Sequence, residues 1–185
     1  PPPHDRYRRQ RKMCIRDSCV LADRHTTVLA DRLIHHSLLV GVRASGARLQ
    51  RFQHNDLTDL ERRLQAMAGQ PGSVVVLSES LFSMEGTSPD VAALAALCQR
   101  FGADLLMDEA HALGVLGPEG RGLCFGIEPV RLISGTFGKA FGSGGAFLAC
   151  DADLGDALLQ TSGAFRYTTA LALSLIHISE PTRLI

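Results

Sequence analysis

The sequence predicts an α/β fold, a three-layer sandwich in which helices cover both faces of a mainly parallel sheet. Short apolar runs typical of buried strands alternate along the chain with stretches whose apolar residues recur at helical spacing. The chain has 185 residues and is 45% hydrophobic, which is enough for one domain with a core. In sheets of this kind, ligands bind beyond the carboxyl ends of the strands.

The first half of the chain begins this alternation. A strand is expected at residues 27–30, and a helical stretch from Leu38 to Ala44 ends near Gly46. Residues 48–52 alternate as a strand does, and Asp56 can cap the next helix. The apolar residues of that helix share one face, namely Leu57, Leu60, Leu64 and Met67. Residues 70–72 then break the chain.

The second half repeats the pattern. Residues 73–77 form a β-branched run typical of a buried strand, and Ser88 with Pro89 marks a helix start. The stripe of that helix comprises Val91, Leu94, Cys98 and Phe101. Further strands are expected at residues 104–107, 129–134 and 145–150, before a helix from about Asp153. The repeated order of strand and helix favours parallel strands.

Composition excludes several classes of function. Nineteen basic and nineteen acidic residues give a formal net charge of zero, so nucleic acid and anionic membranes are not expected partners. The apolar runs fall far short of the roughly 18 residues that a membrane span needs. Five cysteines occur without a CxxC pair or metal-ligand spacing, so we expect a soluble cytoplasmic protein with reduced thiols and no metal.

Both ends of the chain differ from its middle. Residues 1–26 begin with three prolines and a cluster of basic residues, and the pentapeptide VLADR occurs at residues 20–24 and again at 28–32. We expect residues 1–26 and 172–185 to be non-native tails around a partial cofactor-binding large domain at residues 27–171. The chain by itself is expected to be inactive.

Three polar clusters directly follow predicted strands, at residues 79–85, 108–111 and 135–139. Asp108 ends an apolar run and His111 follows three residues later, so both side chains can converge on one ligand. A capped strand end with a solvated histidine explains this pair equally well. The third cluster places Lys139 among five glycines of the segment GTFGKAFGSGG, whose backbone can approach a ligand closely.

The segment Asp-Glu-Ala-His also occurs in ATPases, and a DEAH-type ATPase is the alternative from another class. That function needs a preceding GxxxxGK[ST] loop, which the chain lacks. Lys139 lies downstream of the segment and is followed by alanine rather than by serine or threonine. A remnant that keeps the fold without binding a ligand is a third hypothesis.

Pyridoxal phosphate chemistry uses all these residue types. It requires a lysine for a Schiff base and an acid opposite the pyridine nitrogen, as Lys139 and Asp108 can supply. The imidazole of His111 can hydrogen-bond the phenolic oxygen of this cofactor. The hydroxyls of Ser83 and Thr136 can bind its phosphate, although both residue types are common in turns.

The chain resembles the α-oxoamine synthase family of pyridoxal-phosphate enzymes over about residues 27–171. The matching segments, in order, are DRLIHHSLL, RFQHNDL, SESLFSMEG, LLMDEAHALGVLGPEGRG, GTFGKAFGSGGAFLA and FRYTTAL. The resemblance implies the large domain of fold-type I pyridoxal-phosphate enzymes. The amino-terminal portion and the carboxy-terminal domain of the family have no counterpart here.

The resemblance also implies roles for individual residues. Lys139 corresponds to the Schiff-base lysine, and Asp108 and His111 correspond to the residues at the ring nitrogen and the phenolic oxygen. Thr136 corresponds to a phosphate ligand, and Ser83 corresponds to a further cofactor contact.

Two further roles follow from the same resemblance. His35 corresponds to the histidine that stacks on the cofactor ring, although Ile34 stands where the family usually has asparagine; alone, His35 would be read as an ordinary helix-start histidine. Thr169 corresponds to a threonine that reaches the phosphate of the neighbouring subunit in a homodimer.

The resemblance extends to the reaction, a decarboxylative condensation of an amino acid with an acyl thioester. The segments YTTAL and SGARLQRFQHND favour the branch of biotin biosynthesis, which makes 8-amino-7-oxononanoate from L-alanine and a pimeloyl thioester of coenzyme A or of a carrier protein. The sister branches, which include glycine C-acetyltransferase, 5-aminolevulinate synthase and serine palmitoyltransferase, remain alternatives.

Overall fold

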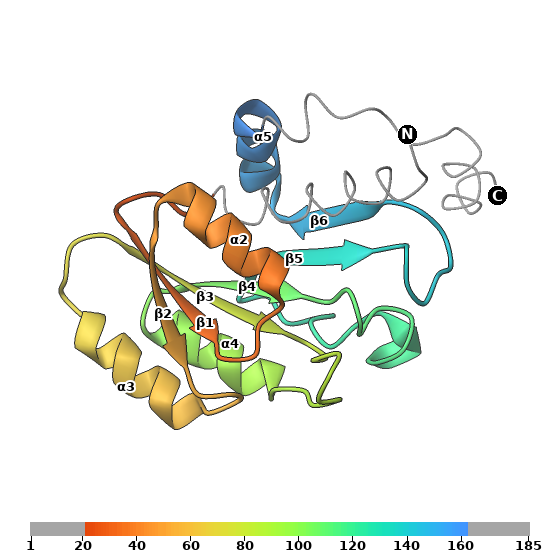
Figure 1. The fold of residues 1–185 in the computed structure, drawn as a ribbon, viewed down its shortest axis with the longest axis horizontal. Helices are drawn as coiled ribbons and strands as arrows, with labels where there is room; N and C mark the ends of the chain where they lie inside the picture. The colour runs from red at the N-terminus through yellow and green to blue at the C-terminus, as the bar shows by residue number, and fades with distance from the viewer. Residues whose placement is uncertain (1–20, 163–185) are drawn as a thin grey trace.

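The computed structural model describes residues 21–162, which form a six-stranded sheet of order β2-β1-β3-β4-β5-β6 (Figure 1). The strands are β1 (Thr26–Asp31), β2 (Arg48–Phe52), β3 (Ser73–Glu79), β4 (Asp104–Asp108), β5 (Val130–Thr136) and β6 (Ala146–Cys150). The strands β1 to β5 run parallel to their neighbours, whereas β6 pairs antiparallel with β5. The predicted α/β fold with a mainly parallel sheet is therefore confirmed.

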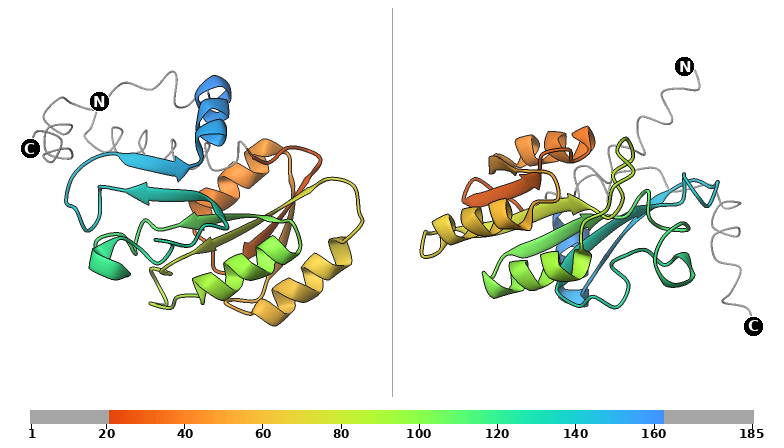
Figure 2. Two further views of the ribbon diagram at one scale, coloured as in Figure 1. Left: turned by 180° about the vertical axis from the view of Figure 1, so that it is seen from behind. Right: turned by 90° about the horizontal axis from the view of Figure 1, so that it is seen from below.

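Helices cover both faces of the sheet. Helices α2 (His36–Ser45) and α5 (Ala152–Thr161) contribute Leu38, Val42 and Leu158 to one core cluster. Helices α3 (Leu57–Met67) and α4 (Val91–Arg100) contribute to the second cluster and lie side by side when the molecule is seen from behind (Figure 2). The central strands are buried on both faces because each cluster packs against one of them.

Local capping signals explain most helix boundaries. Asp56 caps α3 by accepting hydrogen bonds from Thr58 N and Asp59 N, as the sequence predicts. Gly46 ends α2 in the left-handed conformation, at φ 77°. Helix α4 begins later than predicted, because Asp90, rather than the preceding Ser-Pro pair, supplies the cap by accepting from Ala93 N.

Several strands differ from their predicted bounds. Strands β3, β4 and β5 run on through Glu79, Asp108 and Thr136, so the polar clusters begin within the strands instead of after them. Strand β1 begins at Thr26, one residue before its predicted start at residue 27. Ala22, which precedes it, already packs in the first core cluster.

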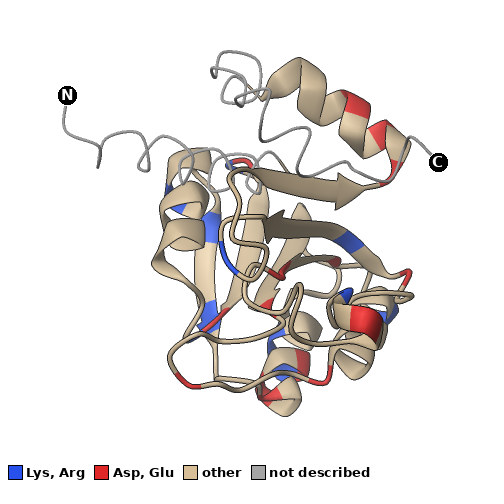
Figure 3. Cartoon of the chain, turned by 90° about the vertical axis from the view of Figure 1, so that its right-hand side faces the viewer, with Lys and Arg blue, Asp and Glu red and all other residues tan. Residues whose placement is uncertain are grey.

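The charge distribution of residues 21–162 agrees with the zero net charge of the chain. Acidic and basic positions are interspersed along the elements seen in Figure 3. Within residues 21–162, no helix is long and apolar enough to cross a membrane. Over the same range, no group of three or more His, Cys, Asp and Glu side chains could hold a metal ion, and Cys98, Cys124 and Cys150 are free thiols.

Candidate active site

Four of the predicted site residues meet at the carboxyl edge of the parallel strands. Asp108 is the last residue of β4, His111 lies in the turn that follows, and Lys139 lies in the loop from β5 to β6. His35 lies at the start of α2, after β1. The charges of Lys139, Asp108 and His35 all act on His111, so each of the three lies within electrostatic reach of that histidine.

The closest contact of this group joins Lys139 and His111. The Nζ atom of Lys139 lies 2.6 Å from Nε2 and 3.0 Å from Nδ1 of the imidazole. Burial lowers the pKa of His111, and the positive charge of Lys139 lowers it further against the opposing effect of Asp108. A neutral imidazole can accept a hydrogen bond from the lysine ammonium, so the contact is favourable near neutral pH.

Asp108 is held by its own turn. Its Oδ1 accepts a hydrogen bond from Ala110 N at 2.9 Å, and the residue is only half-buried. The capped strand end, the alternative interpretation of Asp108, is therefore present. The same carboxylate acts electrostatically on His111, so capping and a role in a site are compatible.

Glu79 adds a second carboxylate beside Asp108, because the two residues are register partners on β3 and β4. Its side chain is 3% exposed, and its Oε1 accepts a hydrogen bond from His35 N at 2.5 Å. Burial raises the pKa of Glu79 to about 7, and the charge of Asp108 adds to this effect. The His35 amide and the charge of Lys139 act in the opposite direction.

The ring of His35 serves the helix that follows it. His35 is the N-cap of α2, and its Nδ1 lies 3.3 Å from Ser37 N and 2.6 Å from Ser37 Oγ. The interpretation of His35 as a helix-start histidine is therefore confirmed. The residue is exposed on the same edge as Lys139, so its ring is also accessible to a ligand.

Thr136 shapes the base of the lysine loop. Its Oγ1 donates to Gly145 O at 3.0 Å and accepts from Gly138 N at 3.1 Å. A side chain at Gly135 would meet the Phe147 ring, since a Cβ there would lie 2.4 Å from Cζ. The glycines of this loop therefore permit a close approach of the β5 and β6 segments that carry Lys139 between them.

The two remaining predicted residues are not joined to this group by a described contact. Ser83 lies exposed in the loop between β3 and α4, on the same edge of the sheet. Thr169 lies outside the described residues.

The acidic residue next to Asp108 anchors the following loop. Glu109 is 1% exposed, and its Oε1 accepts hydrogen bonds from Ser80 Oγ at 2.7 Å and from Cys124 N at 2.9 Å. A side chain at Gly122 would meet this carboxylate, since a Cβ there would lie 2.0 Å from Oε2. Glu109 is thus fully engaged within the fold and does not face the site.

Sequence reasoning missed the roles of Asp31 and Glu79. In the sequence, Glu79 belongs to a polar cluster without an assigned function, and Asp31 belongs to a segment that resembles the family. Each is a carboxylate at the end of an apolar strand, and that position was the available signal. Asp31 is 0% exposed and acts electrostatically on Glu79.

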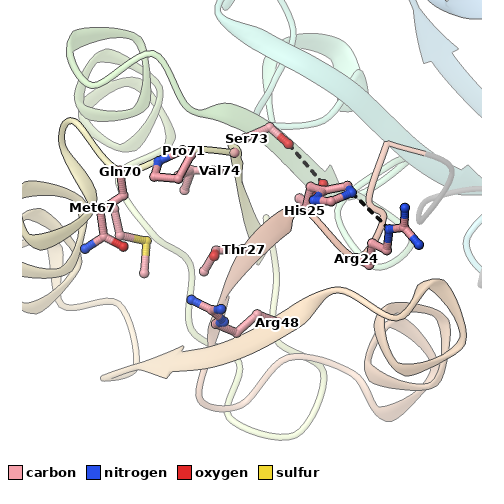
Figure 4. A pocket seen from close by; sticks show the side chains of 11 residues that line it. Arg24, His25, Thr27, Arg48, Met67, Gln70, Pro71, Ser73 and Val74 are labelled. Atoms are coloured by element: carbon pink, nitrogen blue, oxygen red, sulfur yellow. Dashed lines mark hydrogen bonds between the residues drawn. The ribbon is translucent and has the colours of Figure 1, made fainter.

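A hollow of about 260 Å³ lies at the opposite, amino edge of the sheet (Figure 4). It is lined by the starts of β1, β2 and β3 and includes Arg24, His25, Arg48 and Gln70. None of the predicted site residues lines this hollow.

Comparison with known proteins identifies relatives of this chain. The sequence profile described as aminotransferase class I and II matches residues 15–184. The 8-amino-7-oxononanoate synthase of Chromohalobacter salexigens is 49% identical over 154 residues, which cover 81% of this chain and 39% of the relative. The chain spans 36% to 40% of the length of such curated relatives.

Solved structures agree with this result. A serine palmitoyltransferase structure with pyridoxal phosphate matches with a TM-score of 0.83 and 28% identity, over 92% of this chain and 43% of that chain. The 8-amino-7-oxononanoate synthase of Francisella tularensis matches with a TM-score of 0.70 and 28% identity, over 85% of this chain and 47% of that chain. The resemblance to the α-oxoamine synthases is confirmed, and the chain belongs to the aminotransferase class I and II family.

Proposed function

We propose that this chain carries the pyridoxal phosphate site of an acyltransferase that condenses L-alanine with a pimeloyl thioester. The products are 8-amino-7-oxononanoate, carbon dioxide and the free thiol of coenzyme A or of a carrier protein. The observation that carries the proposal is the convergence of Lys139, His111 and Asp108 at the carboxyl edge, with Lys139 Nζ 2.6 Å from His111 Nε2. The curated relatives named for this product support the choice of reaction.

The residues present fit this cofactor. It requires an amine that can bond covalently, an acid for the ring nitrogen and donors for the phenolic oxygen. The amine of Lys139 lies against His111, and Asp108 lies within electrostatic reach of that histidine. A buried second carboxyl group, Glu79, lies beside Asp108, and the charge of Asp108 helps to keep its proton on.

When bound, pyridoxal phosphate supplies an electron sink for the charge that develops at the α-carbon of the amino acid. Lys139 would hold the cofactor and would move protons at that α-carbon. Asp108 would keep a proton on the ring nitrogen, and His111 would hydrogen-bond the phenolic oxygen. His35 would lie against the ring face, where its exposed position on the edge allows contact.

Hydroxyl groups would complete the site. Thr136 and Ser83 would bind the cofactor phosphate from the loops after β5 and β3. Thr169 would reach the phosphate site of a second subunit. A cytoplasmic homodimer is therefore part of the same proposal.

The choice of substrates can be tested directly. A protein extended to the length of the curated relatives is offered L-alanine with pimeloyl-CoA, glycine with acetyl-CoA or succinyl-CoA, and L-serine with palmitoyl-CoA. We expect release of free thiol to be fastest with alanine and the pimeloyl thioester. Faster release with another pair would assign the chain to a sister branch and leave the cofactor site unchanged.

The DEAH-type ATPase alternative gains no support from the site. Lys139 lies in a loop that leads from β5 directly to β6, whereas a phosphate-binding loop leads from a strand into a helix whose N-terminus faces the phosphates. Glu109, the second residue of the DEAH segment, is buried against Ser80 and Cys124 N and cannot face a nucleotide.

A further inference from the structure

Three residues far apart in the sequence form a hydrogen-bonded chain at the carboxyl edge. The Nδ1 atom of His54 lies 2.9 Å from Asp31 Oδ1, and its Nε2 lies 2.7 Å from Thr87 Oγ1. Asp31 ends β1, His54 lies in the turn between β2 and α3, and Thr87 lies in the loop between β3 and α4. The chain therefore connects three separate loops of one edge.

Asp31 is the fixed end of this chain. Its side chain is 0% exposed, and its Oδ1 accepts a hydrogen bond from Leu33 N at 2.8 Å while Oδ2 accepts from Asn55 N at 2.9 Å. Leu33 lies two residues before His35, so the carboxylate holds the segment that leads to His35. A buried carboxylate with several donors has little freedom to move.

His54 holds both ends of the short loop that contains Ser83. Its ring packs edge-on against Phe82 with centroids 4.5 Å apart, and Phe82 is 1% exposed. Its Nε2 contacts the hydroxyl of Thr87 at the other end. The backbone closes the same loop, because Phe82 N donates to Thr87 O at 2.9 Å and Gly86 N donates to Phe82 O at 2.8 Å.

We infer that Asp31, His54 and Thr87 are positioning residues that set the Ser83 loop relative to the segment carrying His35. The inference rests on the proposed function, because it concerns how two predicted cofactor contacts are held together. Ser83 itself is exposed, so its place depends on the ends of its loop. His54 fixes both ends through one ring, and Asp31 fixes that ring.

The test uses Thr87→Val, which removes one hydroxyl from an exposed residue and keeps its shape. Thr161→Val is the matched control, since Thr161 is exposed and donates its hydroxyl to Ala157 O at 2.7 Å in α5. In the cofactor-free 185-residue chain, hydrogen exchange of the amides of Phe82 and Gly86 should accelerate roughly 5-fold in Thr87→Val, as the loss of one hydrogen bond allows. Exchange of Phe137 and Ser143 should not change.

Pyridoxal phosphate titration of a protein extended to the length of the curated relatives provides the second readout. Thr87→Val should weaken binding about 2- to 10-fold, and a double-mutant cycle with Ser83→Ala should be non-additive, because Thr87 is argued to act through Ser83. If Thr87→Val only destabilised the fold, it would lower the affinity for pyridoxal phosphate by the same factor in the chain with Ser83 and in the Ser83→Ala chain.

Each outcome of these experiments supports or overturns the inference. Unchanged exchange in the Ser83 loop, or additive effects on affinity, would overturn the inference. If a protein extended to the length of the curated relatives binds no pyridoxal phosphate, the proposed function fails. The exchange data, which need no cofactor, would then decide whether Asp31, His54 and Thr87 hold the Ser83 loop.

Discussion

Replacing Glu79 by Gln should change how the stability of this protein depends on pH. Glu79 is 3% exposed and faces Asp108 on β4, Asp31 on β1, His35 before α2 and Lys139 after β5. Burial and the neighbouring carboxylates disfavour its charged form. Glutamine keeps the size of the side chain and an oxygen for the His35 amide, but it cannot ionise.

The direction follows from proton linkage. The pKa of Glu79 rises from 4.5 to about 7 on folding, so the folded chain binds this proton more tightly than the unfolded chain does. The stabilisation is complete below pH 4.5 and is lost as the pH rises through 7. The rise corresponds to a change of about 3 kcal/mol in the free energy of unfolding across this window.

Thermal unfolding of the cofactor-free chain, followed by circular dichroism between pH 4.5 and 8.5, measures this effect. The substituted chain should gain stability relative to the unsubstituted chain as the pH rises, reaching roughly 6 to 12 °C in Tm for a domain of this size. The exposed Glu128→Gln provides the control and should show no such trend. A difference in Tm that stays constant with pH would refute the argument.

Three further substitutions have defined outcomes. In a protein extended to the length of the relatives, Asp108→Asn should lower turnover by about 10²- to 10³-fold with a smaller effect on cofactor content, and undiminished turnover would contradict its role. Gly122→Ala should cost at least about 2 kcal/mol by denaturant unfolding, because φ is +90° and the new Cβ would lie 2.0 Å from Glu109 Oε2. Gly126→Ala shares a positive φ of +80° without a nearby atom and should cost less; equal losses would contradict the steric explanation. Asp56→Ala should cost about 1 kcal/mol through loss of the α3 cap, and an unchanged unfolding midpoint would argue against this.

Features that depend on neighbouring residues in the sequence were predicted well. The cap at Asp56 and the left-handed end at Gly46 are local, and the structure has both where they were expected. The grouping of Asp108, His111 and Lys139 was also predictable, because the carboxyl ends of parallel strands share one edge. Ser83 and Thr136 were proposed as phosphate ligands from their hydroxyls, and the resemblance added His35 and Thr169; the roles of all four stay predictions.

Features that depend on tertiary packing could not be predicted in the same way. Residues 145–150 read as a strand, but the antiparallel pairing of β6 with β5 was missed, although the connection between them is too short for a parallel crossover. The burial of Glu79 depends on Asp108 of the adjacent strand and on the backbone of His35. The contact of His54 with Thr87 joins residues 33 positions apart, and no periodicity in the sequence indicates it.

The covalent attachment of the cofactor tests the central claim most directly. The chain contains only two lysines, Lys12 and Lys139, so the attachment site can be mapped without ambiguity. Incubation with pyridoxal phosphate, reduction with borohydride and peptide mass mapping should place the label on Lys139, and Lys139→Arg should abolish it. A label on Lys12, or on the amino terminus, with Lys139 unmodified would contradict the proposed site.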